Sequence, residues 1–251
     1  MSHQRESTHN SNQHAMHSKI DQHSRNILFF GDPQLGSHRG WQRFLTYFPN
    51  AEHLIWNKGT PKAPLHQALR QKHWDITISF YNDFIFEHDD FPFLGLPLNL
   101  HPALPTIRGV GHDHIPLIEG HPEHGGTLHY LQQPPRLWQN AADVIDNGRV
   151  IRTRKRELSP LTNYAEIRSA NQEIMLEMLS ELCEQLLSWG SVESVQQALD
   201  VEATENGHSW GKRYIGHSER DIILNTLRLS DPNHRALAIG NQTELPLLSN
   251  A

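Results

Sequence analysis

The sequence has very little cysteine, with Cys183 the only one among 251 residues. A single thiol excludes an intramolecular disulfide and any zinc site built from several thiolates. Long apolar runs are also missing: nothing approaches about 18 consecutive apolar residues, so no transmembrane helix is predicted. The first residues lack the basic start and apolar stretch of a secretory signal. We therefore expect a soluble cytosolic protein with no membrane partner.

Excess positive charge is missing as well. The net charge is −6, and acidic and basic residues are interspersed along the chain. The one basic cluster, RVIRTRKRE at 149–157, is interpreted as the solvated face of a strand. Nucleic-acid binding needs a basic face, so no nucleic-acid partner is predicted. At 37 % hydrophobic residues, the chain can form one domain with a small appendage.

Histidine, by contrast, is abundant, with 19 copies. Five of them lie in residues 1–24, which contain almost no large apolar side chains. We expect this segment to be a disordered, histidine-rich tail outside the fold. Residues 25–190 would then form the main domain, and 191–251 a small C-terminal region of a helix and a hairpin.

Apolar patterning predicts strands that alternate with helices, which indicates an α/β fold with a mostly parallel sheet and helices on both faces. The expected strands lie at 25–32, 53–56, 74–81, 97–101, 126–131 and 148–153, with helices at 40–48, 63–73 and 159–190. Ser159 or Thr162 is expected to cap the last helix. A long loop at 132–145, which contains Trp138, is the expected lid of a site.

Asn99 and His101 stand two residues apart at the end of a predicted strand, so both side chains leave on one face. Ligand sites of such sheets lie beyond the carboxyl ends of the strands. Together with the carboxylate of Asp146, an amide and an imidazole suit acyl transfer through a tetrahedral intermediate. The alternative that Asn99 and His101 only satisfy backbone groups stays open. So does a metal-dependent hydrolase that uses His112 and His114, or His121 and His124.

Three ordered stretches around these residues, NLHPALPTIRG, GGTLHYL and IDNGRVI, carry the motifs N-x-H-P, L-P-x-x-R-G, G-x-T-x-H and D-x-G. In this order they resemble the formyltetrahydrofolate-dependent formyltransferases over residues 75–157. The resemblance implies a Rossmann-like formyltransferase domain with Asn99, His101 and Asp146 as its catalytic triad. It also implies N10-formyltetrahydrofolate as cosubstrate, and no metal. Ile107, where the family often has an aromatic residue, is a departure from the pattern.

The resemblance further implies where the ligands bind. Folate-binding residues would be Phe80, Tyr81, Phe84, Ile85, Arg108, Gly109 and Asp143, and Thr127 and His129 would line the floor of the site. Recognition of a nucleotide would need an aromatic or arginine side chain near the base. The candidate for this role is WGKRY at 210–214, with Trp210, Lys212 and Tyr214 as acceptor-binding residues, and the alternative for this stretch is a turn of a hairpin. The length of the chain and the lack of a basic surface favour the members that formylate nucleotide-linked amino sugars. The resemblance to these members implies a homodimer and a role in lipopolysaccharide O-antigen synthesis. A small amine such as a siderophore precursor is the alternative acceptor.

Overall fold

A central six-stranded sheet organises the structure, a computed structural model that describes residues 25–238 apart from the side chain of Leu35. The predicted tail at 1–24 lies outside the described residues. The strands follow the order β2 (Glu52–Ile55), β1 (Ile27–Gly31), β3 (Ile76–Phe80), β4 (Leu96–His101), β6 (Glu123–Tyr130) and β7 (Val150–Glu157). The first four strands are parallel, and β6 and β7 are antiparallel to their neighbours. The prediction of a mostly parallel α/β sheet is confirmed.

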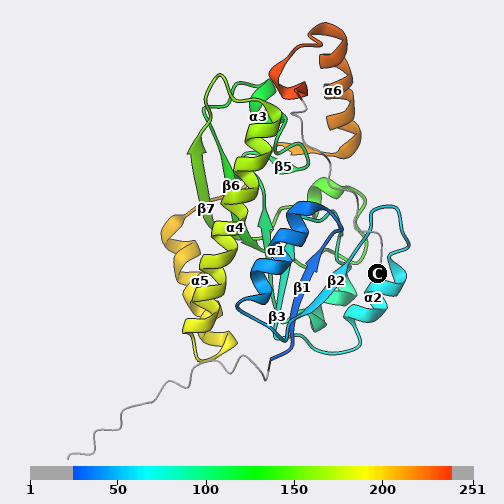
Figure 1. Ribbon diagram of the computed structural model, residues 1–251. Coiled ribbons are helices and arrows are strands. Elements are labelled where there is room, and N and C mark those ends of the chain that lie inside the picture. Colours follow the sequence, from blue (N-terminus) through cyan, green and yellow to red (C-terminus); the bar gives the residue numbers. More distant parts are fainter. Residues whose placement is uncertain (1–24, 239–251) are drawn as a thin grey trace, which may run out of the picture.

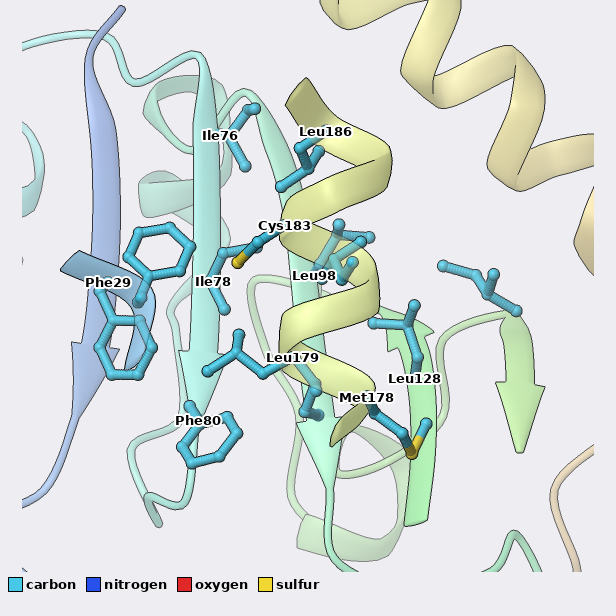
Figure 2. Close-up of a cluster of buried hydrophobic side chains, with 14 of the residues drawn as sticks. Phe29, Ile76, Ile78, Phe80, Leu98, Leu128, Met178, Leu179, Cys183 and Leu186 are labelled. Carbon is cyan, nitrogen blue, oxygen red and sulfur yellow. The ribbon is translucent and has the colours of Figure 1, made fainter. Parts of the chain in front are cut away.

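Helices cover both faces of this sheet, because side chains alternate along each strand. Phe29 of β1 packs with α1 (Leu35–Leu45) and α4 (Tyr164–Ser188) in one buried cluster. Leu28 and Phe30 face the opposite cluster, which includes Leu69 of α2 (Ala63–Leu69). Figure 1 shows α1 and α4 on the same face, and Figure 2 shows the apolar contacts of α4 with β3 and β4.

The same alternation on β4 separates core from site. Leu96, Leu98 and Leu100 belong to the cluster beneath α4. Asn99 and His101 therefore point to the opposite face, as their spacing predicted. Because β3 and β4 are parallel, the carboxyl end of β4 lies beside that of β3, and the polar pair sits at this edge of the sheet.

The longest helix, α4, begins with a capping box. The Asn163 side chain accepts from the Glu166 N–H at 3.1 Å, and the Glu166 side chain accepts from the Asn163 N–H at 2.9 Å. The predicted caps, Ser159 and Thr162, were therefore wrong. Only Asn163 has a glutamate three residues later to complete the reciprocal pair.

The C-terminal region divides into two parts. Helix α5 (Val192–Asn206) packs on β7 and contributes Val195, Leu199 and Ala203 to the main core. Beyond it, β8 (Tyr214–Ile215) pairs in parallel with β5 (Arg108–Gly109) where a hairpin was expected, and α6 (His217–Ser230) and a short 3-10 turn (Arg235–Leu237) follow. The division at residue 190 remains a prediction. Within 25–238, no helix is long and apolar enough to cross a membrane.

Candidate active site

A cavity of about 470 Å³ opens at the carboxyl ends of β1, β3 and β4. Asn99, His101 and Asp146 meet in its wall, although Asp146 lies far along the chain in the loop before β7. One part of the lining is apolar and comes from 84–91 and from 131–145. The rest is polar and comes from the segments after β1 and β5 and from the first turns of α4 and α6.

Asn99 faces His129, its register partner on β6. The His129 Nδ1–H donates to the Tyr130 carbonyl at 2.7 Å, so Nε2 accepts from the Asn99 amide at 2.9 Å. An amide nitrogen carries two N–H groups, which leaves one of them for a ligand. Asn99 is thus a fixed, neutral donor in the cavity wall.

His101 is buried with its ring orientation fixed by the backbone. The Nε2–H donates to the Ile107 carbonyl at 2.9 Å, and Nδ1 lies 3.4 Å from Oδ2 of Asp146. Burial lowers the pKa of His101 below its ordinary 6.5, although Asp146 and the Ile107 carbonyl act in the opposite direction. At neutral pH the imidazole is therefore uncharged, and Nδ1 has a free lone pair.

Asp146 is held from several sides. Its Oδ2 accepts from the Gly109 N–H at 2.7 Å, and its Oδ1 lies 3.6 Å from Nε2 of His129. Burial alone would raise the pKa of Asp146, but the two imidazoles and the Gly109 N–H outweigh burial and lower the pKa to about 2. The backbone of Asp146 is left-handed, with φ +46°, a strained conformation for aspartate. The site therefore contains an ionised carboxylate beside a neutral imidazole.

The loop that carries Asp146 is anchored by Arg108. Its Nε donates to the Asp146 carbonyl at 2.8 Å, and its Nη2 donates to the carbonyls of Ile145, at 2.7 Å, and Ala142. Gly109, the next residue, has φ +80°, and a Cβ there would lie 2.3 Å from the Ile215 carbonyl oxygen. The Arg-Gly pair therefore allows β8 to approach and holds the Asp146 loop.

Trp210 anchors the same loop at its other end. The indole Nε1–H donates to the Gly148 carbonyl at 2.6 Å. The ring meets His101 and His129 edge to face, with centroid distances of 5.6 and 4.9 Å. Trp210 is absent from the cavity lining, so the structure places it behind the reactive residues and not in the predicted acceptor contact.

Some of the other predicted ligand-binding residues line the cavity, and others do not. Tyr81, Phe84, Ile85, Gly109 and Tyr214 line the cavity. Phe80 instead packs in the core beside Phe29, and Asp143 and the exposed Lys212 do not reach the cavity. Of the loop 132–145, Gln132, Pro134, Ala141, Val144 and Ile145 reach the cavity, but Trp138 does not.

The apolar part of the cavity fits a flat heteroaromatic ring. Phe84, Ile85 and Phe86 line it, as do Val144 and Ile145 of the long loop. Apolar walls with backbone polar groups close by are typical of sites for such ligands. The residues present therefore fit the pterin of a folate.

The histidines of the metal-hydrolase alternative are directed to different partners. His121 pairs with Glu119 at the surface, and His124 donates to Asn171 in the interior. The His114 ring stacks on Tyr164, with centroids 4.3 Å apart. Residues 25–238 contain no group of three or more histidine, cysteine, aspartate or glutamate side chains placed to hold one metal ion. The geometry therefore gives this alternative no support.

Sequence reasoning missed the polar end of the cavity, where Asp113, Arg168 and Arg220 contribute to the lining. A signal was available on α4. Asn171 falls on the apolar stripe of this helix, between Ile167 and Ile174, and a polar residue in that position needs a buried partner. His129 was assigned to the floor of the site, but its contact with Asn99 gives it a closer role.

No protein-family model matches the chain, and no curated protein matches it in sequence. Solved structures do match. The N-formyltransferase from Helicobacter canadensis, solved with folinic acid and dTDP-3-aminofucose, has a TM-score of 0.55 at 14 % identity, over 76 % of this chain and 71 % of that one. The fold is that of the N-formyltransferases.

Two further matches share this N-formyltransferase fold. The formyltransferase PseJ from Anoxybacillus kamchatkensis, solved with UDP-4,6-dideoxy-4-formamido-L-AltNAc and tetrahydrofolate, has a TM-score of 0.54 at 16 % identity and covers 84 % of this chain and 96 % of its own. A 4-N formyltransferase from Francisella tularensis has a TM-score of 0.52 at 15 % identity, with 77 % of each chain covered. The predicted Rossmann-like formyltransferase fold is therefore confirmed.

The neutral state of His101 can be tested directly. We expect its ring signals in a ¹³C NMR titration to move only below pH 6.5, because burial disfavours the charged imidazole. Asp146→Asn should lower that midpoint further, since the Asp146 charge favours protonation of His101. The signal is assigned by its absence in His101→Asn. A midpoint at or above 6.5 would contradict the assignment of a neutral ring.

Proposed function

We propose that the protein transfers the formyl group of N10-formyltetrahydrofolate to the primary amine of a nucleotide-linked amino-deoxysugar. The observation that carries this proposal is the convergence of Asn99, His101 and Asp146 in the wall of a single cavity that has both an apolar and a polar part. The apolar part suits the pterin, and the polar part suits a hydroxylated acceptor. Similar folds solved with folates and nucleotide sugars support the pairing of ligands.

Asn99, His101 and Asp146 each have a separate role in the proposed reaction. Bound folate supplies an electrophilic formyl carbon. The free Asn99 N–H donates to the negative charge that develops on the formyl oxygen when the amine attacks. Asp146 takes the proton of the amine, directly or through Nδ1 of His101, and the carboxylate 3.4 Å away stabilises the imidazolium that forms. Once protonated, the His101 Nδ1–H can also donate to the oxyanion. Collapse of the tetrahedral adduct then re-forms the formyl C=O and breaks the bond between the formyl carbon and N10, and the proton taken from the amine passes to N10, so that tetrahydrofolate leaves.

The identity of the amine, a cytosolic location, a homodimer and a role in O-antigen synthesis belong to the same proposal. The Helicobacter and Anoxybacillus enzymes, solved with dTDP- and UDP-linked sugars, support a nucleotide-linked acceptor. A homodimer and the O-antigen pathway are carried over from the resemblance of the four motifs alone.

The test is formyl transfer by the purified protein to a panel of nucleotide-linked 3-amino- and 4-amino-deoxysugars, with a plain diamine included as a non-sugar acceptor. We expect turnover with at least one sugar, with release of tetrahydrofolate and a product heavier by one formyl group. Turnover should persist after dialysis against a chelator and be lost in Asn99→Ala. Turnover that a chelator abolishes, or that survives Asp146→Asn at the wild-type rate, would overturn the proposal.

A further inference from the structure

A second buried carboxylate, Asp113, lines the polar part of the cavity. It follows β5 in the segment Val110–His114, and only 9 % of its side chain is exposed. Its Oδ1 accepts from the Asn171 side-chain amide at 2.8 Å. Burial of a carboxylate is costly unless it is hydrogen bonded, so its position in the wall needs an explanation.

Hydrogen bonds from residues of α4 and β6 hold the Asp113 side chain in position. Asn171 is 1 % exposed and lies on the apolar face of α4. While its amide donates to Asp113, its own oxygen accepts from Nδ1–H of His124, on β6, at 2.6 Å. A leucine at 171 would extend the apolar stripe of α4 without any such partners. The interior therefore contains two polar residues whose hydrogen bonds fix the direction of one cavity carboxylate.

The other oxygen of Asp113 has capacity left for a ligand. Nε2 of His112 lies 3.5 Å from this oxygen, Oδ2. Arg168, three residues before Asn171 on α4, donates to the Tyr164 hydroxyl at 2.8 Å, and no ion pair within 4.0 Å joins it to Asp113 in the described chain. A carboxylate offers about four lone-pair positions, and the bond from Asn171 uses one of them.

The position of Asp113 in the cavity determines which group of an acceptor it can bind. His112 stands next to it, and the charge of His112 would act on His101. The His112 ring meets Tyr81 edge to face, with centroids 6.3 Å apart, and the pKa of Tyr81 is raised by burial and by the charge of Asp113. The reacting amine belongs at Asn99, His101 and Asp146, so Asp113 meets a different group of the same molecule. Hydroxyl groups, which donate directional hydrogen bonds, suit a fixed carboxylate.

We propose that Asp113 binds a hydroxyl group of the acceptor, and that Asn171 and His124 are positioning residues that direct the carboxylate into the cavity. This inference rests on the proposed function and specifies it: the acceptor is a polyhydroxylated amine and not a plain polyamine. The acceptor subsite then consists of residues from the segment after β5 and from α4, with folate on the opposite, apolar side.

The test compares Asp113→Asn, Asn171→Ala and the control Asp231→Asn, which removes a carboxylate from an exposed position outside the cavity lining. Asp113→Asn keeps the size of the side chain and an oxygen for the Asn171 amide. We expect the KM for the best nucleotide-linked amino sugar to rise about 10- to 100-fold, the range for a lost hydrogen bond to a charged group. The dissociation constant for tetrahydrofolate should stay unchanged.

Asn171→Ala, which removes a residue with no place in the cavity lining, should raise the same KM, while a simple structural role would change only the thermal midpoint. Asp231→Asn should match the wild type. If the wild type transfers formyl groups and Asp113→Asn keeps its acceptor KM within twofold, the inference about Asp113 is wrong. If the wild type binds tetrahydrofolate but formylates the diamine as well as any sugar, the inference is also wrong. If it neither binds folate nor transfers formyl groups, the proposed function itself fails.

Discussion

Asp146→Asn should lower kcat for formyl transfer by about 10³-fold, within the range for loss of a positioned proton acceptor. Asparagine is nearly isosteric, and its side-chain oxygen can still accept from the Gly109 N–H. The negative charge, however, is lost, so neither the amine proton nor an imidazolium at His101 is stabilised. The KM values for folate and acceptor should change by less than about threefold, because the charge acts mainly in the transition state.

The measurement is the initial rate of tetrahydrofolate release at saturating concentrations of both substrates. Asp143→Asn is a matched control, since this carboxylate lies in the same loop but outside the cavity lining. It should retain wild-type kcat. If Asp146→Asn kept a tenth of the activity or more, another group would be the proton acceptor.

The second large effect is expected at Arg108, a predicted folate-binding residue that does not line the cavity. Arg108→Gln removes the donors that hold the carbonyls of Ala142, Ile145 and Asp146. The strained backbone of Asp146 then lacks its anchor, and the carboxylate can leave the productive position. Since a shift of about 1 Å can cost about 10²-fold in rate, we expect kcat to fall by roughly that factor.

Trp210→Phe tests the other anchor of the loop. Phenylalanine keeps an aromatic ring near His101 and His129 but loses the N–H that binds the Gly148 carbonyl. We expect a smaller drop in kcat than for Arg108→Gln and an altered pH profile.

Arg136→Gln, at an exposed position of the long loop, serves as control for Arg108→Gln. Equal activity of Arg108→Gln and Arg136→Gln would exclude the anchoring role of Arg108.

Local patterns were sufficient for most of the sheet. The alternation along β4 placed Asn99 and His101 on one face and the leucines on the other, since side-chain direction has a period of two. The apolar stripe of α4 likewise predicted this helix. The helix begins after Asn163 and not at the predicted Ser159 or Thr162, because only Asn163 has a glutamate three residues later for the reciprocal hydrogen bonds.

Local sequence patterns could not predict contacts between short segments that lie far apart in the sequence. The strands β5 and β8 have two residues each, too few for any periodic signal, so their pairing was not predicted. Trp210 was predicted to bind the acceptor because an aromatic side chain suits a nucleotide base. Its contacts with Gly148, His101 and His129 join residues far apart in the sequence, so no local pattern indicated them. The meeting of Asp146 with His101 came from the motif resemblance and not from the residues themselves.

The parallel pairing of β5 with β8 has a consequence for protein synthesis. A nascent chain that has emerged only as far as α5 already carries Asn99, His101 and Asp146, together with every strand of the main sheet. It still lacks Trp210 and the strand that pairs beside Arg108. The main buried cluster beneath α4, to which α5 contributes the last residues, is therefore synthesised before the residues that hold the reactive groups in place.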